Sequence, residues 1–211
     1  MLSEVSWHNN FGYDPTRHHL AVSGHHLRRL EIRADSSGLK LMRQFNIVDE
    51  LHLNVHVMEG IQEYKRFLEG TDKLARCEVL VIRFMKMEHS FKSAMLHLLR
   101  QCTRVRKLVV QVTTNMDDYP CKLLSKCPCS LPENRKTKNV LSGLLEQVQV
   151  DDYGEARTTV ELVRLLCKCS DIQKRVTITT MSPEGTQSKY IGMNVIRSIV
   201  SPNTEVEITE R

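Results

Sequence analysis

The chain has 211 residues, of which 41% are hydrophobic and 26% are charged, and a formal net charge of +5 at pH 7; the composition is ordinary for a folded protein and the length allows a sizeable core. No apolar run approaches the roughly 18 residues that a membrane span requires, and the basic residues are scattered rather than gathered into the patch of a nucleic-acid-binding protein. The N-terminus lacks the features of a secretory signal, so we expect the seven cysteines to be reduced thiols. We therefore expect a soluble intracellular protein of the cytoplasm or nucleus. It is expected to bind neither nucleic acid nor membrane.

Residues 1–26 form the first predicted segment, and it is irregular. It contains Gly12, Pro15 and the adjacent histidine pairs 18–19 and 25–26, without a regular apolar period. We expect it to pack poorly on its own, with its histidines at the surface.

From residue 27 onward a short apolar signature recurs: an aliphatic residue or cysteine, two others, an aliphatic residue, one other and an aliphatic residue. Such alternation is typical of a strand with one buried face. The central residues Leu80 and Leu108 are 28 residues apart, and repetition near this length is typical of a leucine-rich-repeat solenoid, in which each unit buries its apolar face against its neighbours. The stretches are Leu27–Leu30–Ile32, Val48–Leu51–Leu53, Cys77–Leu80–Ile82, Val105–Leu108–Val110, Leu145–Val148–Val150, the less regular Ile172–Val176–Ile178, and the closing fragment Val206–Ile208.

Helical periodicity separates these strands. Apolar stripes at helical spacing occur within residues 61–68, 91–102, 162–169 and 192–199. Strands and helices that alternate at this spacing give parallel strands joined by right-handed crossovers. We therefore predict an α/β leucine-rich-repeat solenoid of about six or seven irregular repeats, with parallel strands and crossover helices. Cys102 and Cys169, placed where a helix turns into a strand, are predicted to be core residues.

The spacing of the repeated apolar signature also suggests how the chain is divided into segments. Residues 27–114 are predicted to be leucine-rich repeats. Residues 115–139 form a loop with Cys and Pro, which is a possible boundary between two modules, and residues 140–211 form the C-terminal repeats.

Metal ligands are considered at two places. Cys127-x-Cys129 and Cys167-x-Cys169 could supply four thiolates to zinc, but structural sites usually have longer gaps within each pair. His52 and His56 lie on a predicted strand and so about 13 Å apart, too far to share an ion. We expect no metal and no cofactor.

Catalytic patterns are not found in the sequence. Asp117-Asp118 and Asp151-Asp152 each precede a tyrosine, and turns explain these pairs better than acid–base catalysis does. There is no nucleophile elbow, phosphate-binding glycine loop or dinucleotide fingerprint. The chain is therefore not expected to be an enzyme.

The residues between the buried positions of each strand project onto the opposite, concave face, where solenoid proteins usually bind partners. We predict a polar partner surface there, with a modest apolar centre at Val81 and Val109; ordinary solvated strand residues are the alternative. The predicted surface residues are Glu31, Arg33, His52, Asn54, Val81, Arg83, Val109, Gln111, Gln149, Asp151, Thr177, Thr179 and Glu207.

A set of motifs in the second half of the chain resembles a known module. They are Cys127-Pro128-Cys129-Ser130-Leu131-Pro132-Glu133-Asn134, Leu144-Leu145-Glu146-Gln147-Val148-Gln149-Val150, Leu165-Leu166 and Lys174-Arg175-Val176-Thr177-Ile178. Over residues 120–208 the chain resembles the C-terminal FBD module of plant F-box/leucine-rich-repeat proteins, and the repeats at 27–112 suit the same family. Arg135 stands where this family usually has a tryptophan.

The resemblance implies a non-catalytic protein-interaction module similar to the substrate-recognition region of an SCF-type ubiquitin ligase. The family's F-box has no counterpart in these residues, so a Skp-class adaptor is not expected to bind through this chain. Two alternatives remain open: a small-molecule-sensing leucine-rich-repeat domain, and a truncated F-box-like product without an independent function.

Overall fold

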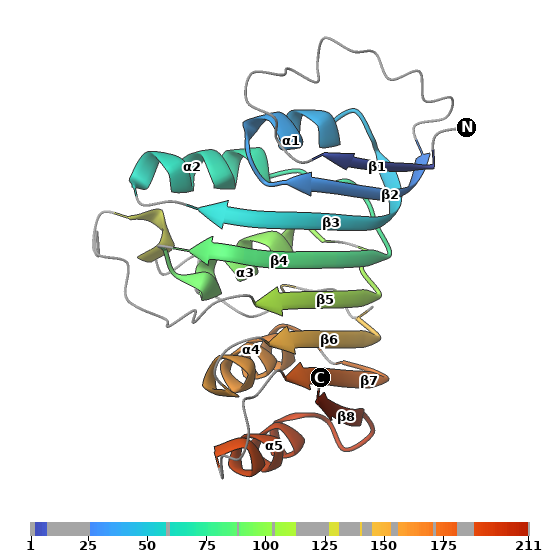
Figure 1. Ribbon diagram of the computed structural model, residues 1–211, viewed down its shortest axis with the longest axis vertical. Helices are drawn as coiled ribbons and strands as arrows, with labels where there is room; N and C mark the ends of the chain where they lie inside the picture. Colours follow the sequence, from blue (N-terminus) through green and yellow to red (C-terminus); the bar gives the residue numbers. More distant parts are fainter. Residues whose placement is uncertain are drawn as a thin grey trace.

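The computed structural model describes residues 3–7, 26–57, 60–87, 89–102, 104–112, 127–130, 140, 145–152, 156–170, 172–180 and 188–210. Eight strands form one sheet in the order of the sequence, and every neighbouring pair is parallel (Figure 1). The strands are β1 (Glu4–Trp7), β2 (His26–Arg33), β3 (Ile47–Val57), β4 (Val79–Met87), β5 (Lys107–Val112), β6 (Gln147–Asp152), β7 (Arg175–Thr180) and β8 (Glu205–Glu210). The helices are α1 (Ser36–Met42), α2 (Ile61–Gly70), α3 (Phe91–Arg100), α4 (Ala156–Cys169), α5 (Ser188–Ile199) and the short 3₁₀ helix η3 (Pro128–Ser130).

The register of the sheet aligns the predicted apolar signature across the molecule. The central positions form one row, with Leu30 beside Leu51, Leu51 beside Leu80, and the series continuing to Val206. The last positions of the signature, from Ile32 to Ile208, form a second row on the same face. The prediction of an α/β chain with parallel strands that alternate with helices is confirmed, and the arrangement resembles a solenoid.

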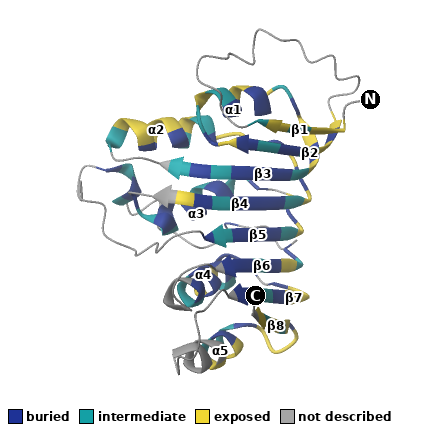
Figure 2. Ribbon diagram, in the orientation of Figure 1, coloured by how far each residue is buried: buried dark blue, intermediate teal, exposed yellow. Residues whose placement is uncertain are grey.

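These two rows and the helices form the core. Leu30, Leu80 and Leu108 are completely buried, and in Figure 2 the central strands are mainly buried while α2 turns an exposed surface outward. Right-handed crossovers between sequential parallel strands place their helices on one face of a sheet. The stripe of α3 is buried as predicted, with Ala94 and Leu98 fully inaccessible.

Two elements at the start of the chain differ from the sequence-based expectation. Glu4–Trp7, inside the segment expected to be irregular, is strand β1 and pairs with β2, with Val5 beside Leu30. The rest of that segment, residues 8–25, lies outside the described residues. Helix α1 was not predicted; Asp35 caps it by accepting hydrogen bonds from the backbone amides of Ser37 and Gly38.

The predicted module boundary is not a break in the sheet. β5 pairs with β6 in continuous register, with Leu108 beside Val148, across the long connection between them. Within the predicted loop the structure describes residues 127–130, where η3 packs against α2 and α3. Arg135 lies outside the described residues.

Both predicted corner cysteines are core residues. Cys102 and Cys169 are 7% and 5% exposed, and the Cys102 thiol donates to the carbonyl of Leu98 at 3.1 Å. Burial raises the pKa of Cys169 to about 11. It also raises the pKa of Cys102 well above its usual range, and that of Cys77, which acts electrostatically on Cys102, to about 12. These thiols are therefore protonated at neutral pH and unreactive as nucleophiles.

None of the helices among the described residues is long and apolar enough to span a membrane.

His97 on α3 predicts a pH dependence of stability. Its Nε2 donates to Oγ1 of Thr71 at 3.0 Å, since the Thr71 hydroxyl itself donates to the carbonyl of Phe67 at 2.6 Å. Burial lowers the pKa of His97, with a contribution from Arg100, despite the opposing effects of the Leu68 backbone and Asp72. The unfolded chain therefore takes up a proton at a pH where the folded protein does not, and the free energy of unfolding should fall as the pH drops below the usual imidazole pKa of about 6.5.

Urea unfolding at a series of pH values checks this prediction. The His97→Gln variant, which keeps an amide donor toward Thr71, should show a weaker dependence between neutral and mildly acidic pH. An identical pH dependence in both proteins would contradict the assignment to His97.

Candidate interaction face

The thirteen surface residues predicted from the sequence lie on the face of the sheet opposite the apolar rows, together with Thr209. We call this the open face. One row across the strands runs Glu31, His52, Val81, Val109, Gln149, Thr177 and Glu207, and the next runs Arg33, Asn54, Arg83, Gln111, Asp151, Thr179 and Thr209. The parallel register thus brings residues from repeats far apart in the sequence side by side.

Arg83 organises the middle of the open face. Its Nε donates to Oε1 of Gln111 at 2.8 Å, and its Nη1 donates to Oδ1 of Asn54 at 3.1 Å. The same Nη1 lies 3.6 Å from a carboxylate oxygen of Glu31. These contacts across β2 to β5 hold the guanidinium in place, so a partner that binds it loses little side-chain entropy.

Glu31 supplies the negative charge at one end of this network. Burial acts to raise the pKa of Glu31, but hydrogen bonds from Arg29 and Asn54, together with the charges of His52 and Arg29, lower it below its usual range. The carboxylate is therefore ionised at neutral pH and pairs with Arg29 at 2.9 Å.

Asp151 ends the network on the other side. It is only 4% exposed, and its carboxylate accepts hydrogen bonds from Nε2 of Gln111 and from Nε2 of Gln149, each at 3.1 Å. A buried carboxylate needs such donors because an unpaired one would be costly. The interpretation of Asp151-Asp152 as a turn is wrong, since both residues belong to β6; Asp117-Asp118 lies outside the described residues.

The predicted apolar centre of the face is present but presents little surface. Val81 and Val109 lie side by side on β4 and β5, yet they are only 6% and 7% exposed. His52 beside them is 9% exposed, with its Nε2 2.5 Å from Oε1 of Glu50. The accessible part of the open face is therefore mainly polar, and the polar network dominates it.

The ends of the face are more exposed. Arg33 on β2 is exposed and its Nη2 lies 3.2 Å from Nδ1 of His56. At the other end Glu207 and Thr209 are exposed and Thr177 is half-buried. Thr179 is buried, and its hydroxyl oxygen lies 3.3 Å from that of Thr209. Polar and charged side chains therefore make up most of what is accessible at both ends of the open face.

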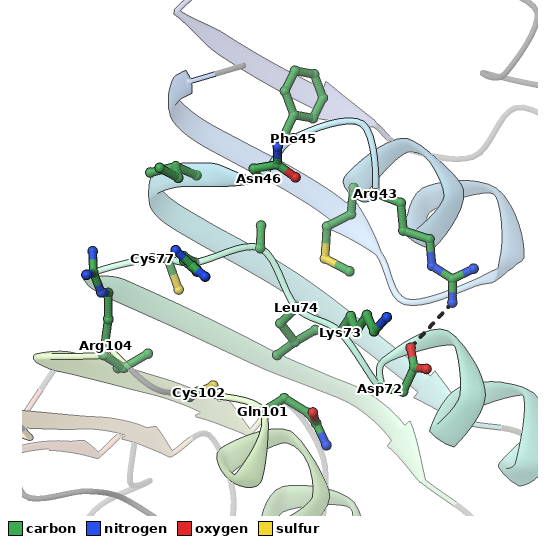
Figure 3. A pocket seen from close by; sticks show the side chains of 15 residues that line it. Arg43, Phe45, Asn46, Asp72, Lys73, Leu74, Cys77, Gln101, Cys102 and Arg104 are labelled. Atoms are coloured by element: carbon green, nitrogen blue, oxygen red, sulfur yellow. Dashed lines mark hydrogen bonds and ion pairs between the residues drawn. The ribbon is translucent and has the colours of Figure 1, made fainter. Parts of the chain in front are cut away.

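A second feature, not foreseen from the sequence, lies at the edge where the strands begin. The connections from α1 to β3, from α2 to β4 and from α3 to β5 line a half-open groove of about 1040 Å³, which we call the edge groove (Figure 3). Its walls carry the basic side chains Arg43, Lys73, Arg76 and Arg104.

The edge groove is lined by more basic than acidic side chains. Asp72 is the acidic residue among those that line it, and it lies 3.5 Å from Nη2 of Arg43, which also donates to the carbonyl of Glu69 at 3.1 Å. Arg104 stands at the opposite end of the groove from this pair (Figure 3). Apolar and thiol side chains such as Leu74 and Cys77 complete the lining.

One group of potential metal ligands is found in the part of the chain that the structure describes. It consists of His89, Cys127 and Cys129, whose ligand atoms lie close together. Neither Cys167 nor Cys169 belongs to it, so the four-thiolate site considered from the sequence is not formed among these residues.

Comparison of the chain with protein-family models, with curated proteins and with solved structures gives no match.

Proposed function

We propose that the chain is a non-catalytic protein-interaction module that binds a partner protein through its open face. The observation that carries this proposal is the hydrogen-bonded network of Glu31, Asn54, Arg83, Gln111 and Asp151 across β2 to β6. Arginine is enriched among the residues that dominate binding energy at protein interfaces. A broad row of side chains presented by parallel strands is also the usual binding surface of solenoid proteins.

The more specific proposal is that this module corresponds to the substrate-recognition region of an F-box protein with leucine-rich repeats. It is supported by the recurrence of the apolar signature, by the alternation of parallel strands and helices, and by the resemblance of residues 120–208 to the FBD module. Under this proposal the bound partner is a substrate of a ubiquitin ligase.

The proposal predicts that Arg83 and Gln111 contribute strongly to partner binding. Proximity labelling in the cells that make the chain identifies the partner, and titration calorimetry with the purified partner measures its affinity. Replacing both residues by alanine should weaken binding about 10-fold or more, because it removes a preorganised cation, the hydrogen bond from Arg83 to Asn54 and the hydrogen bond from Gln111 to Asp151.

Arg66→Ala is a matched control, since Arg66 is an exposed arginine on α2, and it should bind like the wild type. Equal affinity of the Arg83→Ala/Gln111→Ala variant and the wild type would remove the network from the interface. Recovery of a Skp-class adaptor among the labelled proteins would support membership in a ligase, whereas labelling of no specific protein would favour a product without an independent function.

The edge groove favours a second candidate function, which is the sensing of a small anionic molecule. Its volume is in the range of ligand sites, and its lining combines apolar walls with four basic side chains. A thermal-shift screen of anionic metabolites tests it: a ligand should raise Tm in the wild type but not in the Arg76→Ala/Arg104→Ala variant. A screen without any shift would count against this function.

A further inference from the structure

Three side chains of types that commonly bind transition metals, one histidine and two cysteines, are buried together where β4 ends. His89, Cys127 and Cys129 are 4%, 1% and 0% exposed, and their ligand atoms all lie within 4.8 Å of one another. Sγ of Cys127 is 3.3 Å from Nδ1 of His89. His89 lies between β4 and α3, whereas the cysteines belong to the turn around η3, so the cluster joins segments that are 38 residues apart in the sequence.

The ligand set matches zinc. Zn²⁺ binds cysteine sulfur at about 2.3 Å and histidine nitrogen at about 2.0–2.1 Å in a tetrahedron, which places neighbouring ligand atoms about 3.4–3.8 Å apart. The Cys127–His89 distance is already close to this value, and a contraction of about 1 Å brings the remaining pairs into range. Ca²⁺ and Mg²⁺ require oxygen ligands, which this group does not provide.

The surroundings hold the three ligands in place. The hydroxyl of Ser93, which is fully buried on α3, donates to the carbonyl of Cys129 at 2.6 Å. The ring of Tyr64 from α2 packs on the ring of His89 with their centroids 4.7 Å apart. Contacts outside the ligands orient them, and loss of an outer hydrogen-bond partner typically costs about 10- to 100-fold in metal affinity.

We propose that His89, Cys127 and Cys129 bind one Zn²⁺ ion, which fixes the Cys-Pro-Cys turn of the long β5–β6 connection onto helices α2 and α3. The three ligands leave one position of the tetrahedron for a water molecule or another donor. Because the ion closes a loop of 38 residues and the unfolded chain offers no preformed site, binding of the metal stabilises the folded protein.

The first test uses the wild-type chain alone. Reduced protein, stripped of metal and then loaded with Zn²⁺, should retain one ion per chain by elemental analysis after desalting, and its Tm should rise on loading. Loading with Co²⁺ should give the intense absorption of thiolate-to-metal charge transfer together with the visible bands of a tetrahedral site. A folded wild type that retains no zinc, or a Co²⁺ complex without thiolate bands, would overturn the proposal in favour of a metal-free core with a thiol–imidazole hydrogen bond.

The second test assigns the ligands. Competition with a chromogenic chelator should show that Cys127→Ser, Cys129→Ser and His89→Asn each lose more than about 100-fold in zinc affinity, since loss even of outer contacts costs about 10- to 100-fold. Cys167→Ser is the matched control, because this half-buried cysteine of α4 lies outside the cluster, and it should bind zinc like the wild type. Circular dichroism confirms that each variant is folded; undiminished affinity in folded Cys127→Ser and Cys129→Ser would overturn the assignment.

Discussion

Replacement of Leu108 by alanine should lower the free energy of unfolding by about 2–5 kcal/mol. Leu108 is completely buried in the middle of the sheet, between Leu80 on β4 and Val148 on β6. Removing its side chain leaves a cavity that opens toward both neighbouring units, and in a solenoid each unit is stabilised mainly by such contacts with its neighbours. Urea unfolding followed by circular dichroism measures the loss.

Met85→Ala is the control for this substitution. Met85 lies on the neighbouring strand β4 but is 45% exposed, so its truncation should change the free energy of unfolding by less than about 0.5 kcal/mol. A loss at Leu108 as small as that at Met85 would contradict a core shared by neighbouring repeats.

Replacement of Gly38 by alanine should destabilise the protein by about 1–3 kcal/mol. Gly38 is buried in the first turn of α1, and a methyl group on its Cα would overlap the carbonyl oxygen of Arg33. Alanine is favoured over glycine in helices by about 1 kcal/mol. The overlap outweighs this gain because the atom that would have to move is part of the backbone of β2 and not the end of a flexible side chain.

Ser36→Ala is the control: it also places alanine in the first turn of α1, at an exposed position, but adds no atom to the helix. Its effect should stay within about 0.5 kcal/mol. The measurement is again urea unfolding. Stability of Gly38→Ala equal to or above that of the wild type would show that α1 does not lie this close to β2.

The strands and the longer helices could be predicted because apolar residues recur every second residue in the strands and at helical spacing in the helices. Each pattern continues over enough residues to be recognised. Alternation identifies β2 to β8, and helical stripes identify α2, α3 and the C-terminal parts of α4 and α5. In a parallel sheet with equivalent units, neighbouring strands align at equivalent positions, so the rows through Leu80 and Val81 followed from the signature alone. β1 and α1 were missed because four and seven residues are too few to establish a period.

The site was predictable only to the level of which residues share a face. The burial of Val81 and Val109 and the hydrogen bonds of Arg83 depend on the conformations that the long side chains of neighbouring strands adopt. No sequence pattern predicts these conformations. The edge groove and the cluster of His89 with Cys127 arise where connections from different units meet. One signal was available in the sequence, the closely spaced cysteines at 127 and 129, but their histidine partner comes from a distant segment.

Site-specific photo-cross-linking tests the central claim, that a partner protein binds the open face, most directly. A photoreactive amino acid is placed at Arg33 or Thr177 on the open face, and at the exposed helix positions Lys40 or Arg66 as controls. The account predicts that the two open-face positions cross-link to the same partner in cells and that the two helix positions do not. Cross-links to that partner from Lys40 and Arg66, with none from Arg33 and Thr177, would contradict it.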